Sequence, residues 1–174
     1  MVPLDTFLWA FVILFGLMGA LRGWSKEMLV LFSVIVALAM RLIFSEYVPF
    51  VKDLFDRPAR EQFYIYSGLV ILLAVAGYAG PVVSGRLARA SARETLQDIL
   101  LGFIIGAVNG YLIIGSIWYF LDAAGYGVLG IAQPAPNSIA AALAARYLPP
   151  LWLTDPVLLT IFAFASVFVL IVLV

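Results

Sequence analysis

The chain has 174 residues, of which 65% are hydrophobic and only 11% are charged. Soluble domains are about half apolar and about a quarter charged, so this composition excludes an ordinary soluble protein and indicates a membrane protein. Lys and Arg together number 10, as do Asp and Glu, so no basic surplus indicates nucleic acid. Cys and His are absent, which removes disulfides, thiol and imidazole chemistry, and the usual zinc, copper and haem ligands.

The first predicted membrane span covers residues 4–21. We do not interpret it as a signal peptide, because it lacks a basic leading segment and its length suits a full crossing. Gly16, Gly19 and Gly23 follow one another at spacings of three and four residues. They form a small-residue stripe on one helical face, which is typical of close helix packing in lipid.

A polar break at residues 22–27 separates this span from a second one at residues 28–44. Arg41 lies about one turn before the end of the second span, so its guanidinium can extend to the lipid headgroups; a functional intramembrane charge is the alternative. Residues 45–63 contain a short amphipathic segment that predicts an interfacial helix. A third span is predicted at residues 64–83.

Residues 84–97 are polar and predict a helix between the third and fourth spans. Arg86, Arg89 and Arg93 share one face of it, because their spacings are three and four residues. A basic stripe beside a membrane span favours binding to anionic headgroups, and docking of a partner protein is the alternative.

The fourth span, residues 98–122, is the centre of the prediction. It covers roughly 35 Å at about 1.5 Å per residue, enough to cross a bilayer core of about 30 Å. Gly102, Gly106 and Gly110 recur every fourth residue and form a groove, and Asn109 lies beside it. The groove favours helix packing over a substrate path, with the first span as its partner. Asn109 favours an interhelical hydrogen bond over ligand binding.

Two acids, Asp98 and Asp122, bound this span. Their places at its ends favour interfacial acids over proton carriers, and Asp98 can also cap the helix. Residues 123–156 form a Pro-rich loop in which Asn137 or Ser138 caps a short Ala-rich helix. A fifth span then follows at residues 157–174, and it is just long enough to cross.

The predicted fold is therefore an all-α, polytopic membrane bundle of about five transmembrane helices with short interfacial helices. Residues 1–122 form a four-span membrane domain, and residues 123–174 add the Pro-rich loop and the fifth span. The Lys and Arg residues closest to the span ends favour an outside N-terminus and a cytoplasmic C-terminus.

An internal echo links the first and fourth spans. Residues 19–23 and 106–110 both read Gly-Ala-apolar-polar-Gly, with Arg22 and Asn109 as the polar members. Transporter folds often contain such repeats. A match of five residues in a Gly- and Ala-rich chain also arises by chance, so both explanations stay open.

These residues carry a resemblance to the CvpA family, the colicin V production proteins of bacterial inner membranes. That family has an N-terminal Asp, a first span ending in Arg-Gly, and a Glu a few residues later, which correspond to Asp5, Arg22-Gly23 and Glu27. Its later signature runs from an Asp through Leu-Gly and Gly-Ala-x-Arg-Gly to a closing Asp. The corresponding residues are Asp98, Leu101-Gly102, Gly106-Ala107-Val108, Gly110 and Asp122.

The chain departs from this pattern at two points. Asn109 stands where the family has its second Arg, and a fifth span follows the usual four. The resemblance implies a bacterial inner-membrane protein linked to toxin production or export and to envelope maintenance. It supplies no molecular mechanism.

Three functions are compatible with the sequence. The first is a CvpA-like, non-enzymatic protein that acts by packing against membrane partners. The second is an accessory subunit of a larger respiratory or photosynthetic complex, and the third is an oligomeric small-solute channel or transporter component. We expect no catalytic, cofactor or metal site, because no known constellation occurs and the predicted spans hold no ionisable group near mid-depth. The expected partners are membrane lipids and either other membrane proteins or further copies of the chain.

Overall fold

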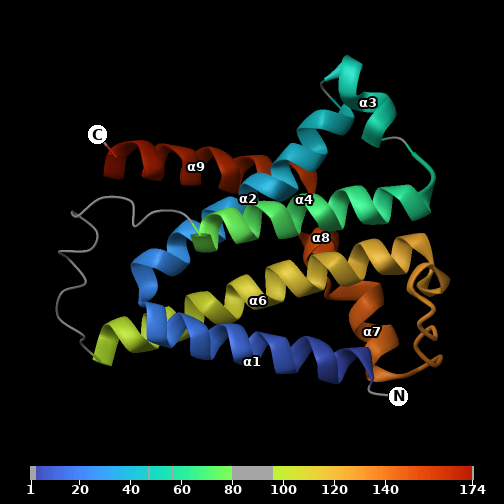
Figure 1. The fold of residues 1–174 in the computed structure, drawn as a ribbon, viewed down its shortest axis with the longest axis horizontal. Helices are drawn as coiled ribbons and strands as arrows, with labels where there is room; N and C mark the ends of the chain where they lie inside the picture. Colours follow the sequence, from blue (N-terminus) through green and yellow to red (C-terminus); the bar gives the residue numbers. More distant parts are fainter. Residues whose placement is uncertain (1–2, 47, 56, 80–95, 174) are drawn as a thin grey trace.

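A computed structural model describes residues 3–46, 48–55, 57–79 and 96–173. Four long helices dominate it: α1 (Leu4–Arg22), α2 (Trp24–Glu46), α4 (Ala59–Ala79) and α6 (Leu96–Ala124). Each is long and apolar enough to cross a membrane. The all-helical, multi-pass membrane fold predicted from the composition is therefore confirmed for the described residues (Figure 1).

Within the described residues, four short helices and one further helix of 19 residues connect and flank these long helices. They are α3 (Pro49–Phe55), the 3-10 helix η1 (Tyr126–Leu129), α7 (Ile139–Arg146), α8 (Pro149–Trp152) and α9 (Asp155–Leu173). Ser138 caps α7, because its hydroxyl accepts a hydrogen bond from the backbone N–H of Ala141 at 3.1 Å. Asn137, the other predicted cap, precedes it with φ 63°.

The predicted fifth span, residues 157–174, is covered almost entirely by α9. Among the described residues, 139–152 and 155–167 are long and apolar enough to cross as a pair, bent by 50° at the break between them. Pro149, Pro150 and Pro156 lie around this break, and each lacks the N–H that an uninterrupted helix needs. Within the described residues, the number of spans is five when the bent pair is counted as one.

The second long helix begins four residues earlier than the sequence predicts. Gly23 has φ 85°, a conformation that favours glycine, and its N–H bonds to the Gly19 carbonyl at 2.9 Å to end α1. The next residue, Trp24, already belongs to α2. Only Gly23 therefore lies between the two helices, and the polar residues 24–27 form the first turn of α2, which contains Glu27.

The bundle is built on two tight helix pairs. In Figure 1, α1 lies along α6, and α2 crosses α4, with which it is in contact. α2 is the most central helix, since Val30, Val34, Ala37 and Ala39 have no exposed surface. α9 packs against the outer side of α2.

Glycines set the distance between α1 and α6. A Cβ on Gly19 would overlap the Gly102 backbone, and one on Gly106 would overlap the carbonyl oxygen of Phe15. Gly110 faces the Cβ of Phe15 in the same way. Because lipid gives helices no hydrophobic reason to associate, such backbone contact supplies much of the van der Waals attraction that holds a membrane bundle together.

Replacing Gly106 by Ala tests this seam. The added methyl meets backbone of α1, which cannot rotate away, so we expect Gly106→Ala to destabilise the protein in detergent by about 1–3 kcal/mol. Gly68→Ala is the matched control, because nothing lies within 4 Å of its Cβ position. Thermal unfolding of the two variants measures the difference, and equal midpoints would contradict the packing account.

Candidate functional site

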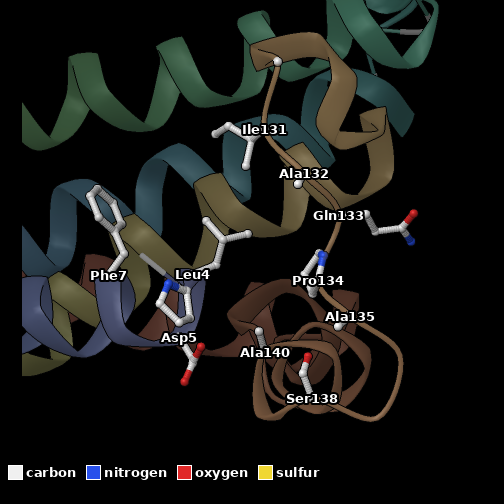
Figure 2. Close-up of a pocket in the computed structure, with 12 residues that line it drawn as sticks. Leu4, Asp5, Phe7, Ile131, Ala132, Gln133, Pro134, Ala135, Ser138 and Ala140 are labelled. Carbon is white, nitrogen blue, oxygen red and sulfur yellow. The ribbon is translucent and has the colours of Figure 1, made fainter. Parts of the chain in front are cut away.

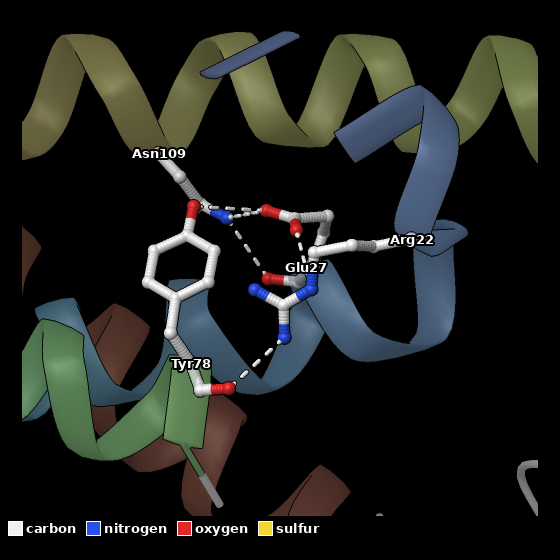
Figure 3. Close-up of polar contacts among 4 residues, drawn as sticks. All are labelled: Arg22, Glu27, Tyr78 and Asn109. Carbon is white, nitrogen blue, oxygen red and sulfur yellow. Dashed lines mark hydrogen bonds and ion pairs between the residues drawn. The ribbon is translucent and has the colours of Figure 1, made fainter. Parts of the chain in front are cut away.

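A fully buried carboxylate lies where the four long helices meet. Glu27, in the first turn of α2, has 0% of its surface exposed. Burying a charge costs several kcal/mol unless it is paired and hydrogen-bonded. The neighbours of Glu27 therefore decide whether the bundle can hold it (Figure 3).

Two helices supply hydrogen-bond donors to one carboxylate oxygen. The Asn109 amide nitrogen, from α6, donates to Glu27 Oε2 at 2.9 Å and to the Glu27 backbone oxygen at 3.0 Å. The Tyr78 hydroxyl, from α4, donates to the same Oε2 at 3.3 Å. Both partners of the amide are acceptors, so its nitrogen, not its oxygen, must face Glu27.

Arg22, at the end of α1, supplies the positive charge. Its Nε lies 3.7 Å from Glu27 Oε1, an ion pair too long to be a hydrogen bond. A terminal nitrogen donates to the Tyr78 backbone oxygen at 3.3 Å, and the guanidinium lies 4.4 Å from the Tyr78 ring centroid. The side chain is 25% exposed, so Arg22 closes the cluster on its outer side.

Two acceptor atoms in this cluster lack a hydrogen-bond donor. Glu27 Oε1 and Asn109 Oδ1 are both buried and unpartnered. Each flanks the hydrogen bond between Glu27 and Asn109, so the two belong to one small polar region. Chemically, this region can accept hydrogen bonds from a small donor group, while Arg22 balances the carboxylate charge.

The two similar sequence elements, residues 19–23 and 106–110, lie next to each other in the structure. Gly19 and Gly106, the first residues of the two elements, contact each other across the α1–α6 seam. Arg22 and Asn109, their polar members, both reach Glu27. The echo therefore corresponds to two elements that pack together and share one acid.

The remaining acids and bases predicted from the sequence lie elsewhere. Asp5 is in the first turn of α1, about 25 Å from Arg22 along the helix. Asp98 is in the first turn of α6, where a carboxylate complements the helix dipole. The guanidinium of Arg41 lies over the rings of Tyr66 and Phe120. The stripe of Arg86, Arg89 and Arg93 lies outside the described residues.

The glycine positions all fall on or beside the α1–α6 seam. Gly16 faces the ring of Phe103, and Gly23 lies next to Gly102. The other four lie between the two backbones, as described above: Gly19, Gly102, Gly106 and Gly110.

Sequence reasoning named Glu27 only as a family-motif residue and missed its burial. Glu27 lies outside the predicted second span of residues 28–44, but α2 begins at Trp24 and encloses it. Tyr78 went unrecognised as a donor to an acid, since nothing in an apolar run indicates which hydroxyl faces inward. The Arg-Gly-x-x-x-Glu spacing was the available signal, because a glycine turn folds Arg22 back toward Glu27.

A pocket of about 670 Å³ lies at the other end of α1 (Figure 2). It is bounded by the first turn of α1, the loop after η1 and the start of α7. Leu4, Phe7, Ile131 and Pro134 give it a mainly apolar lining, to which Asp5 adds the charged side chain. It holds none of the residues of the Glu27 cluster.

Asp122, at the end of α6, belongs to a separate polar chain. The Trp118 ring nitrogen donates to the Tyr126 hydroxyl at 3.1 Å, and that hydroxyl donates to the Asp122 carboxylate at 2.8 Å. Burial, with a further contribution from Asp122, raises the pKa of Tyr126 to about 12, although the Trp118 hydrogen bond opposes the shift. Tyr126 therefore stays neutral at physiological pH and anchors η1 to α6.

The role of Asn109 in holding the buried acid is directly testable. Asn109→Leu removes both hydrogen bonds to Glu27 and leaves Oε2 with the longer Tyr78 contact. We expect a loss of about 1–3 kcal/mol of stability in detergent. The control is Val108→Leu, because Val108 is the neighbouring residue and is 42% exposed. Equal unfolding midpoints for the two variants would show that Asn109 does not stabilise the acid.

Comparison with known proteins identifies the family. The model of the colicin V production protein family matches residues 4–130, which include all four helices of the bundle and the whole Glu27 cluster. No curated protein and no solved structure gives a significant match. Among the residues that the structure describes, no group of three or more Asp or Glu is placed to hold a metal ion. The chain thus belongs to the colicin V production protein family, as a multi-pass membrane member of it.

Proposed function

We propose that this chain is a non-enzymatic protein of the bacterial inner membrane that acts by packing against membrane partners. The process would be toxin production or export, or the maintenance of the envelope, as its family implies. The observation that carries the proposal is the division of α1 into two unlike sides. One side is fixed to α6 by glycines, and the other is left open.

The open side of α1 is large and mainly apolar, with Thr6 as an exposed polar residue. Only 17% of the membrane-spanning segment of α1 is buried within the chain. The large hydrophobic side chains that it leaves exposed are Phe7, Trp9, Ile13, Leu14, Leu17, Met18 and Leu21. A helix that uses one narrow seam for its own bundle retains most of its surface for lipid or for a partner helix.

The absence of catalysis is part of this proposal. The buried polar side chains of the cluster largely satisfy one another, with Asn109, Tyr78 and Arg22 all directed at Glu27. The chain also has no His or Cys to act as base or nucleophile. The polar groups therefore support a structural role better than a reaction.

Photo-crosslinking from the open face tests partner docking. A crosslinking residue at Leu17, which is 53% exposed on α1, should give discrete adducts with specific membrane proteins in cells. The same residue at Leu72, 65% exposed on α4, controls for random collisions in the membrane. Equal adducts from both positions, or lipid adducts only, would contradict docking through α1. One fixed, stoichiometric complex would favour an accessory subunit of that complex.

A second candidate, a channel or transporter component, is favoured by Glu27. Transporters keep ionisable groups inside the bundle, and Glu27 has a buried oxygen without a donor. In proteoliposomes this candidate predicts proton or monovalent-cation flux that Glu27→Gln abolishes. Glu61→Gln is the control, because Glu61 is exposed and pairs with Arg57 at 3.5 Å. No flux above empty vesicles, or flux unchanged in Glu27→Gln, would reject the candidate.

A further inference from the structure

Arg41 is held inside the other end of the bundle by aromatic rings. Its guanidinium carbon lies 5.5 Å from the Tyr66 ring centroid on α4 and 5.9 Å from that of Phe120 on α6. Its Nε is completely covered and has no hydrogen-bond partner. Arg41 as a whole residue is only partly buried.

The positive charge of Arg41 is not balanced within the described part of the chain. Arg22 pairs with Glu27, and Arg57 pairs with Glu61, but no ion pair joins Arg41 to a described side chain. Asp122, the acid that ends the α6 span, accepts the Tyr126 hydroxyl instead. Ring faces attract a cation, yet they offset only part of the desolvation of a guanidinium in an apolar bundle.

The position of Arg41 indicates which anion can reach it. Arg41 lies five residues before the end of α2, and Phe120 lies four residues before the end of α6. At about 1.5 Å per residue, the site is roughly 6–8 Å inside the helix ends, a depth that a lipid headgroup can meet. The planar guanidinium of Arg41 matches the oxygens of a phosphate, to which it can donate two parallel hydrogen bonds.

We propose that Arg41 binds the phosphate of an anionic phospholipid headgroup between the ends of α2, α4 and α6. Tyr66 and Phe120 hold the guanidinium in place, so it is ordered before the lipid arrives. A zwitterionic lipid brings its own cation to the site and leaves the Arg41 charge unbalanced. The site therefore prefers phosphatidylglycerol to phosphatidylcholine.

Lipid retention measured by native mass spectrometry tests this site. The full chain is reconstituted with equal phosphatidylglycerol and phosphatidylcholine, extracted in mild detergent, and the bound lipids are counted. The wild type should retain phosphatidylglycerol preferentially, and Arg41→Gln should reduce that retention about fivefold to tenfold. Arg60→Gln is the matched control, because Arg60 is an exposed arginine at the start of α4. It should retain lipid as the wild type does.

Several outcomes would overturn the proposal. Equal retention by wild type and Arg41→Gln would show that Arg41 holds no lipid. Displacement of the lipid by inorganic phosphate at matched concentration would mean a general phosphate site, and an acidic protein bound through Arg41 would mean a protein contact. Should Arg41→Gln fail to fold, Arg41→Lys replaces it: Lys keeps the charge without the fork, so reduced retention supports the proposal and unchanged retention contradicts it.

Discussion

A carboxylate with no exposed surface is the constraint on which this bundle depends. Glu27 belongs to α2, and its partners come from α1, α4 and α6, so one side chain joins all four long helices. An unpaired acid in this position would cost more than most bundles can tolerate. The helices must therefore meet in one arrangement, with Arg22, Tyr78 and Asn109 all within reach. The glycine seam makes this possible, because it lets α1 approach α6 closely enough for the turn at Gly23 to bring Arg22 inward.

The long helices could be predicted from the sequence because each is a sustained apolar run, and such a run in lipid has to satisfy its backbone internally. Glycine spacing placed the small residues on one face each of α1 and α6, and these faces contact each other in the structure. The start of α2 could not be predicted in the same way. Residues 22–27 are polar, and polarity by itself indicates a surface loop; only the neighbours of Glu27 reveal that its carboxylate is buried. The bend at residues 153–154 accompanies the packing of α8 against α6 and of α9 against α2, which hydropathy does not encode.

The structure gives a physical reason why Asn109 can replace the Arg of the family's Gly-Ala-x-Arg-Gly element. The family carries an Arg where this chain has Asn109, and the structure places that position directly against the Glu27 carboxylate. A second Arg would add a positive charge beside Arg22, whereas an amide adds hydrogen bonds and leaves the charge balanced by Arg22. This chain therefore keeps the acid and the first Arg and replaces the second cation by a neutral donor. Glu27 Oε1 accepts no hydrogen bond and has its closest charged neighbour in Arg22, at 3.7 Å.

The central claim is that Glu27 and Asn109 stabilise the bundle as a pair. A double-mutant cycle with Glu27→Gln, Asn109→Leu and the double variant, followed by unfolding in detergent, measures their coupling free energy. We expect a coupling of at least about 1 kcal/mol, because the two side chains share a buried, charge-assisted hydrogen bond of 2.9 Å. Additive losses, with a coupling within roughly 0.3 kcal/mol of zero, would contradict the account.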